Sequence, residues 1–248
     1  MSNWEEIWSK AGTRQLWSIP DLRVVELVNE WKSEPQIHRV LDIGCGLGRH
    51  AFVLAQAGLE VYGLDHSETA IENCREWFQS TGLTGTFWCG ELDDIPYPDG
   101  YFDAVLAFNS IYHDTGEKVE QILSLISDKT KVDGVCFITI PSQNNRLYGQ
   151  GEEIAPHTYV SPGMYDQLFD GGGERGVTHH FCSKEEIPAL FQNFHIDSLV
   201  EEEFQIASLN RLTNHVSWRR VKQSYFWQIT VRKGSHASRS IIESKIAG

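Results

Sequence analysis

The 248-residue chain has few basic residues, and this shortage limits the partners it can bind. It carries 21 Lys and Arg against 34 Asp and Glu, which gives a formal net charge of −13 at pH 7. Binding to a phosphate backbone without regard to sequence depends on clustered Lys and Arg. The charge therefore disfavours a nucleic-acid partner and favours a small-molecule substrate.

The chain also lacks long apolar runs and paired cysteines. No stretch approaches the roughly 20 apolar residues of a membrane-spanning helix. The N-terminus has Trp4, Glu5 and Glu6 where a secretion signal would have a basic and then an apolar segment. The cysteines show no CxxC pair and are expected to be reduced thiols: Cys45, Cys74, Cys89, Cys136 and Cys182. We expect a cytoplasmic protein with no membrane partner.

Short apolar runs alternate with amphipathic stretches along most of the chain. The runs predict strands at 39–43, 59–64, 84–89, 102–108, 134–140, 195–200 and 224–231. The stretches between them predict helices at 49–57, 67–80, 117–127 and 183–191. Such alternation indicates an α/β fold with a doubly wound, Rossmann-like sheet of seven mostly parallel strands and helices on both faces. We assign this domain to residues 36–233.

Three segments lie outside the predicted core. Residues 1–35 form an expected helical segment that holds four of the eight tryptophans, and either a lid over a ligand or simple packing on the core would explain them. Residues 142–182 form a long insertion after the fifth strand, and connections of that length are usually functional or disordered. The tail at 234–248 is expected to be non-functional.

A glycine-rich turn after the first strand carries most of the functional information. Residues 41–48 read Leu-Asp-Ile-Gly-Cys-Gly-Leu-Gly, and Asp65 follows at the end of the next apolar run. The absence of Cβ atoms at Gly44, Gly46 and Gly48 lets a ligand approach the backbone closely. The Asp65 carboxylate can then bind ribose hydroxyls. This spacing predicts a nucleotide-type cofactor site.

The residue after the last glycine separates two cofactor classes. A dinucleotide-binding turn places its third glycine where this chain has Arg49, so an NAD-dependent oxidoreductase is disfavoured.

With Asp42 two residues ahead of Gly44, the turn resembles motif I of the class I S-adenosylmethionine-dependent methyltransferases, in particular their small-molecule branch. Residues 91–103, which end in Phe102-Asp103, resemble the segment that leads into the fourth strand of that family. The resemblance covers roughly residues 36–141. It implies S-adenosylmethionine as the cofactor and an antiparallel last strand.

The resemblance also implies how the cofactor is divided among these residues. The three glycines would face its amino-acid part and Asp65 its ribose. Glu91 and the Leu92 amide would face the adenine. Asp42 would orient the glycine loop or meet the methionine ammonium, and Asn109 would line the same pocket.

The acceptor side is expected after the fourth strand and in the insertion. His113 is the candidate general base, because histidine titrates near neutrality. A histidine that only packs in the pocket is the alternative. Candidate substrate contacts are Tyr112, Tyr148, His157 and His179. No metal is expected, because no HxH or HxxxH spacing appears and adjacent residues of a strand, such as His179 and His180, face opposite ways.

Together these features predict in-line methyl transfer from S-adenosylmethionine to a small molecule. Two alternatives remain. One is a non-catalytic or regulatory protein that binds the same cofactor. The other is methylation of an amine in a protein or nucleic acid, although Asn109-Ser110-Ile111-Tyr112 keeps only the ends of the Asn-Pro-Pro-Tyr motif typical of that activity.

Overall fold

The computed structural model describes residues 3–9, 17–92, 94–163, 174–210 and 215–234. Beyond Gly234, the tail considered above lies outside the described residues, as does the Gly-Gly-Gly stretch at 171–173. Among the described residues, no helix is both long enough and apolar enough to cross a membrane.

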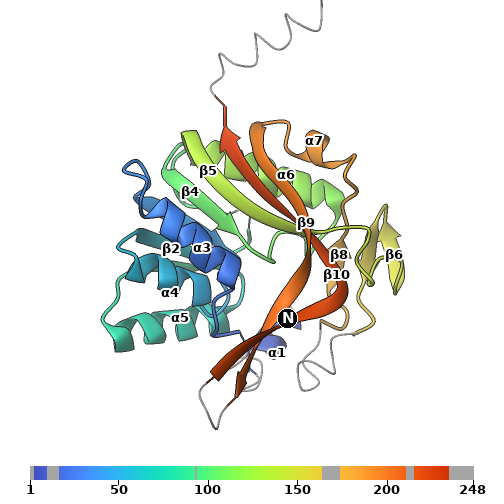
Figure 1. The fold of residues 1–248 in the computed structure, drawn as a ribbon, viewed down its shortest axis with the longest axis horizontal. Coiled ribbons are helices and arrows are strands. Elements are labelled where there is room, and N and C mark those ends of the chain that lie inside the picture. The colour runs from blue at the N-terminus through green and yellow to red at the C-terminus, as the bar shows by residue number, and fades with distance from the viewer. Residues whose placement is uncertain (1–2, 10–16, 93, 164–173, 211–214, 235–248) are drawn as a thin grey trace, which may run out of the picture.

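Seven strands form one sheet in the order β3-β2-β1-β4-β5-β10-β9 (Figure 1). They are β1 Arg39–Ile43, β2 Glu60–Asp65, β3 Thr86–Cys89, β4 Phe102–Ala107, β5 Thr130–Pro141, β9 Phe194–Asn210 and β10 His215–Lys233. The first five are mutually parallel, and β10 runs antiparallel to both β5 and β9. The predicted Rossmann-like sheet with an antiparallel last strand is confirmed.

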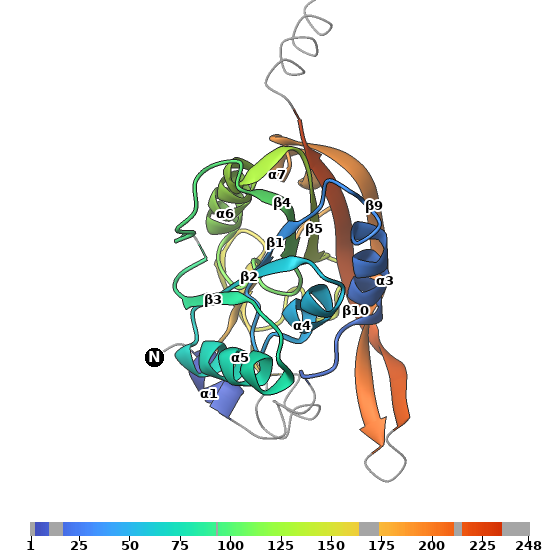
Figure 2. The same ribbon diagram turned by 90° about the vertical axis from the view of Figure 1, so that its left-hand side faces the viewer.

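Helices cover both faces of this sheet, as Figure 2 shows from the side. The helices are α1 Asn3–Ser9, α3 Leu22–Trp31, α4 Arg49–Gln56, α5 Glu68–Thr81, α6 Gly116–Lys129 and α7 Ile187–Leu190. In β1, Val40 packs in a cluster with α3, α4 and α5, whereas its neighbour Leu41 packs in a cluster with α6. Successive strand residues point to opposite faces, so a wholly apolar strand is buried on both sides.

The predicted helix at 183–191 is wrong in its extent. Only Ile187–Leu190 is helical. The Ser183 amide donates to the Glu186 carboxylate, and the Glu186 amide donates to Ser183 Oγ. These two bonds close a turn ahead of the helix, whose N-cap residue is Glu186, so the first residues of the predicted segment are not helical.

The last two strands and the insertion contain more regular structure than predicted. Strands β9 and β10 pair with each other beyond Phe226, where β10 leaves β5, and they continue as a two-stranded arm (Figure 1). The insertion holds a small antiparallel sheet in the order β6-β7-β8, formed by Glu152–Ala155, Thr158–Val160 and Thr178–His180. All five cysteines are free, as expected.

Candidate functional site

A cavity of about 440 Å³ lies at the carboxyl ends of β1, β2 and β4. The sheet order reverses between β1 and β4, and ligands of open α/β sheets bind at such switch points. The volume falls in the range of about 300–1,000 Å³ for small-molecule sites. The wall includes many of the residues singled out by the sequence: Gly44, Gly46, Asp65, Glu91, Leu92, Asn109 and His113.

The glycine turn needs glycine for conformational and steric reasons. Gly44, Gly46 and Gly48 all have positive φ values, of 68°, 53° and 81°. A Cβ on Gly44 would lie 2.3 Å from Ser110 Cβ, and one on Gly48 would lie 2.2 Å from Cys74 Sγ. The sequence predicts that all three glycines face a ligand, but protein neighbours also exclude a side chain at Gly44 and Gly48. Gly48 caps α4 and is not part of the cavity wall.

Asp65 links the glycine turn to the next helix. Its Oδ2 accepts from the Gly46 amide at 2.9 Å, and its Oδ1 accepts from the Ser67 amide at 3.0 Å. Burial raises the pKa of this carboxyl above its usual value, and the two amide bonds oppose that rise. The carboxylate lies in the cavity wall with its position fixed by backbone donors.

Asp42 lies beneath the turn and does not reach the cavity wall. Its side chain is buried, and Oδ2 has no hydrogen-bond partner among the described residues. Burial raises the pKa of Asp42 to about 7, although nearby Arg49 favours the charged form. Its hydrogen bond is to the backbone of Ala51 in α4 and not to the glycine turn, so both roles expected for Asp42 stay predictions.

Arg49 is a residue of the site that sequence reasoning missed. In the sequence Arg49 only indicates that the turn is not a dinucleotide-binding one, whereas in the structure it lines the cavity. Its guanidinium lies 4.5 Å from the Trp17 ring centroid and donates to the Ile19 carbonyl oxygen at 3.2 Å. Burial lowers its pKa to about 10, so it stays charged at neutral pH. The sequence feature that could have identified Arg49 is its position as the first residue of the helix that follows the glycines.

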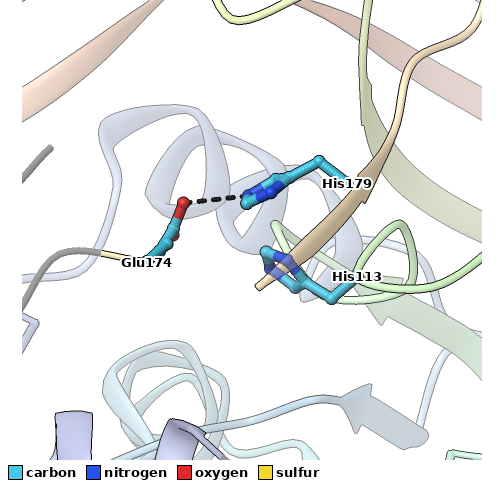
Figure 3. A group of neighbouring side chains, drawn as sticks. All are labelled: His113, Glu174 and His179. Atoms are coloured by element: carbon cyan, nitrogen blue, oxygen red, sulfur yellow. Dashed lines mark hydrogen bonds and ion pairs between the residues drawn. The ribbon is translucent and has the colours of Figure 1, made fainter. Parts of the chain in front are cut away.

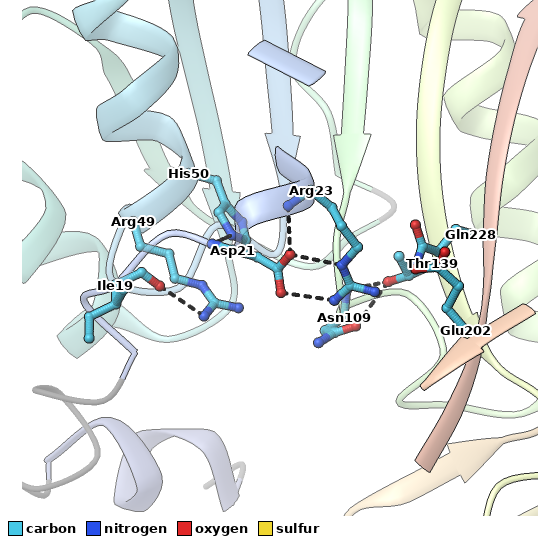
Figure 4. A network of polar contacts seen from close by, with 9 residues as sticks. All are labelled: Ile19, Asp21, Arg23, Arg49, His50, Asn109, Thr139, Glu202 and Gln228. Atoms are coloured by element: carbon cyan, nitrogen blue, oxygen red, sulfur yellow. Dashed lines mark hydrogen bonds and ion pairs between the residues drawn. The ribbon is translucent and has the colours of Figure 1, made fainter. Parts of the chain in front are cut away.

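The segment ahead of α3 is held against this side of the sheet by a polar network (Figure 4). Arg23 donates two bonds of 2.8 Å to the Asp21 carboxylate, and the Asp21 amide donates to His50 Nε2 at 3.2 Å. In the same network the Asn109 side chain accepts from Thr139 Oγ1 at 2.9 Å. Asn109 therefore lines the cavity while its side-chain oxygen is bound to β5.

Helix α1 lies across the cavity. Trp8 packs over the glycine turn, with its ring 3.1 Å from the position of a Cβ on Gly46. The Trp4 ring lies 4.8 Å from the His113 ring, and both tryptophans line the cavity. Burial opposes charge on Glu5, but hydrogen bonds from Thr69 and Ser67 outweigh it and lower the Glu5 pKa. These bonds attach α1 to the start of α5.

His113 also lines the cavity, beside two residues of the insertion. Its ring centroid is 4.9 Å from that of His179, and His179 Nε2 lies 2.9 Å from Glu174 Oε2. Burial lowers the pKa of His113 to about 3, and repulsion from His179 adds to this effect. Such an imidazole is neutral but only weakly basic. The environment does not favour the general-base role that the sequence suggested.

None of the four candidate substrate contacts is part of the cavity wall. Tyr112 is buried in the core, with its ring 5.8 Å from that of Phe226. Tyr148 and His157 bind each other within the insertion, where Tyr148 Oη lies 2.8 Å from His157 Nδ1. The fourth candidate, His179, is buried behind the wall formed by His113 and Glu174.

Sequence comparison finds a match to a methyltransferase domain at residues 40–134. A Haemophilus influenzae protein of uncharacterized function is 38% identical over 179 residues, which are 69% of this chain and 63% of that protein. Human tRNA N(3)-cytidine methyltransferase METTL2B is 25% identical over 211 residues, which are 81% of this chain and 53% of that protein. The chain thus spans less than two thirds of the length of either relative.

Among solved structures, an S-adenosylmethionine-dependent methyltransferase of Methanosarcina mazei has the same fold. It superposes with a TM-score of 0.64 at 19% identity, covering 84% of this chain and 98% of that one.

Proposed function

Since the chain belongs to the class I S-adenosylmethionine-dependent methyltransferases, we propose that it transfers a methyl group from that cofactor to a small-molecule acceptor. When bound, the cofactor supplies an electrophilic methyl group on a sulfonium. The observation that carries the proposal is that the glycine turn, Asp65 and Glu91 line one cavity with His113. The residues predicted for the cofactor and for the acceptor side thus line the same cavity.

The residues of the cavity fit this cofactor. The turn at Gly44 and Gly46 presents backbone to the cavity, and the Arg49 guanidinium can pair with the amino-acid carboxylate of the ligand. Asp65 can bind ribose hydroxyls, and Glu91 with the Leu92 amide can bind adenine. Ser110 also lines the cavity, and its buried Oγ has no hydrogen-bond partner among the described residues.

The protein's own contribution to the reaction would be alignment and exclusion of water. Trp4 and Trp8 line the cavity from α1, and their rings would limit the access of water to a bound acceptor. Holding two reactants in line can supply about 7–11 kcal/mol of the barrier reduction. The reaction therefore does not require a strong base, which agrees with the low pKa of His113.

A nucleic-acid acceptor is the second candidate, because METTL2B acts on tRNA by its name and the similarity extends over 81% of this chain. The net charge of −13 and the covering helix α1 favour a small molecule over a polyanion. Transfer of labelled methyl groups to tRNA, compared with transfer to a metabolite extract, separates the two candidates.

Titration calorimetry with S-adenosylhomocysteine tests the cofactor site. We expect binding by the wild type and strongly weakened binding by Asp65→Ala. No binding by the wild type, or full affinity in the variant, would contradict the assignment. Incubation of metabolite extracts with methyl-labelled cofactor then tests catalysis. Binding without any transfer would instead support a non-catalytic cofactor-binding protein.

A further inference from the structure

Three side chains with metal-binding atoms meet at the acceptor side of the cavity. His113 follows β4, whereas Glu174 and His179 belong to the insertion. One donor atom from each residue lies within 4.8 Å of the other two. Figure 3 shows Glu174 facing His179, with the ring of His113 beside that of His179. We propose that these three residues bind one divalent transition-metal ion in the cavity wall.

The donor set suits such an ion. Two imidazoles and one carboxylate are typical ligands of Zn²⁺ in catalytic sites, and imidazole also suits Fe²⁺, Co²⁺ and Ni²⁺. Magnesium and calcium prefer sites made of oxygen atoms. The set therefore selects the transition metals over the alkaline-earth ions.

The hydrogen bonds of His179 match those of a metal ligand. Its Nδ1 lies 3.2 Å from the Val177 carbonyl oxygen, and its Nε2 lies 2.9 Å from Glu174 Oε2. The contact with the Val177 carbonyl orients the ring through Nδ1 and leaves Nε2 facing the Glu174 carboxylate, so an ion between Nε2 and Oε2 would meet both donor atoms. In a metal-binding histidine, the ring nitrogen that does not bind the metal usually donates a hydrogen bond to a carbonyl or carboxylate oxygen, and this bond fixes the orientation of the ring.

His113 supplies an independent observation. Its Nδ1 is buried and has no hydrogen-bond partner among the described residues. One nitrogen of the His113 ring is therefore not hydrogen-bonded to the surrounding described residues. By contrast, the adjacent His180 uses its Nδ1 on Thr158 Oγ1 at 3.0 Å, on the other side of β8, and does not join the cluster.

The cluster is close to the size that an ion requires. Bonds of about 2.1 Å in a tetrahedral arrangement place the donor atoms about 3.4 Å apart, so the widest separation must close by at most about 1.4 Å. His113 and Glu174 line the cavity, and open coordination positions would face it. With one carboxylate in the set, the occupied site keeps one positive charge.

An ion at this place would hold an oxygen donor of the acceptor, such as a hydroxyl that ionises on binding or a carboxylate. This role rests on the proposed methyl transfer, whereas binding of the ion does not. The structure thus points to acceptors that carry a metal-binding oxygen.

Cobalt(II) titration of the full chain, after removal of metals with a chelator, tests the site. We expect one equivalent to bind with the visible absorption of a four- or five-coordinate ion. Glu174→Gln and His179→Ala should each weaken binding at least tenfold. His195→Ala, which removes an imidazole that is 79% exposed, should leave the affinity unchanged.

S-adenosylhomocysteine affinity and near-ultraviolet circular dichroism of the same preparations show whether each variant keeps its fold. If Glu174→Gln does not fold, His113→Asn takes its place with the same expectation. No cobalt uptake by the wild type, or equal affinity in the folded variants, would overturn the proposal and leave only a hydrogen-bonded contact. Cobalt binding without S-adenosylhomocysteine binding would contradict the proposed function but support the metal site.

Discussion

Asp65 Oδ2 accepts a hydrogen bond from the Gly46 amide at 2.9 Å, which joins the end of β2 to the turn that follows β1. The acid and the glycine turn were separate features of the sequence. In the structure they form one unit, because the parallel pairing of β1 with β2 brings both strand ends to the same edge. A change at either residue should therefore alter the shape of the turn as well as its contacts with a ligand.

Asp65→Asn should weaken binding of S-adenosylhomocysteine about 10- to 100-fold. The amide group lacks one acceptor oxygen, and hydrogen bonds to a charged group contribute about 1.5–3 kcal/mol. Calorimetry measures the effect. Asp99→Asn is the matched control, because that carboxylate is 72% exposed and pairs with Lys129 away from the cavity. Equal losses in both variants would show a general effect of charge.

Trp8→Ala should accelerate dissociation of S-adenosylhomocysteine at least tenfold. The variant removes a buried ring that covers the Gly46 turn, and it opens the cavity to water. Stopped-flow displacement measures the rate. Trp77→Ala is the control, because Trp77 stacks on Phe52 of α4, outside the cavity wall. An unchanged rate in Trp8→Ala would show that α1 does not act as a lid.

Gly48→Ala should lower the free energy of unfolding by about 2–5 kcal/mol. The positive φ costs about 1–2 kcal/mol, and the clash with Cys74 Sγ adds about 1–3 kcal/mol of overpacking. Urea denaturation measures the total loss of unfolding free energy, which contains both the backbone-strain cost and the overpacking cost. Gly58→Ala isolates the first, since Gly58 has φ 86° and nothing within 4 Å of a Cβ.

Cys74→Ala tests the second part of that loss, because it removes the clashing sulfur. The double variant Gly48→Ala/Cys74→Ala should be more stable than the sum of the two single effects predicts. Strict additivity would place the cause of the loss elsewhere.

Asp42→Asn should reduce the pH dependence of stability between about pH 4 and pH 7. Burial raises the folded-state pKa of Asp42 to about 7 from an unfolded value of 3.8. In this window the folded state binds more protons than the unfolded state, so stability falls as pH rises. The contribution has an upper bound of about 4 kcal/mol. Urea denaturation at pH 5 and pH 8 should show the smaller change in the variant.

Much of the fold and about half of the site could be predicted from the sequence. Apolar periodicity located all seven strands of the main sheet, because burial on one or two faces leaves a local pattern in the chain. The turn at 41–48 was equally clear, because positive φ angles demand glycine. Strand β9 was predicted too short, since its outer part pairs only with β10 and the acidic run at 201–203 hides the pattern.

Only the tertiary structure decided which side chains share the cavity. The sequence by itself established the sheet, the glycine turn and the acid at Asp65, since short-range backbone geometry and burial dictate these features. It did not show that Trp8 covers Gly46, that Arg49 faces the cavity, or that Glu174 and His179 meet His113. Those contacts join segments far apart in the chain, and no local spacing records them, because only packing of the folded sheet brings the segments together.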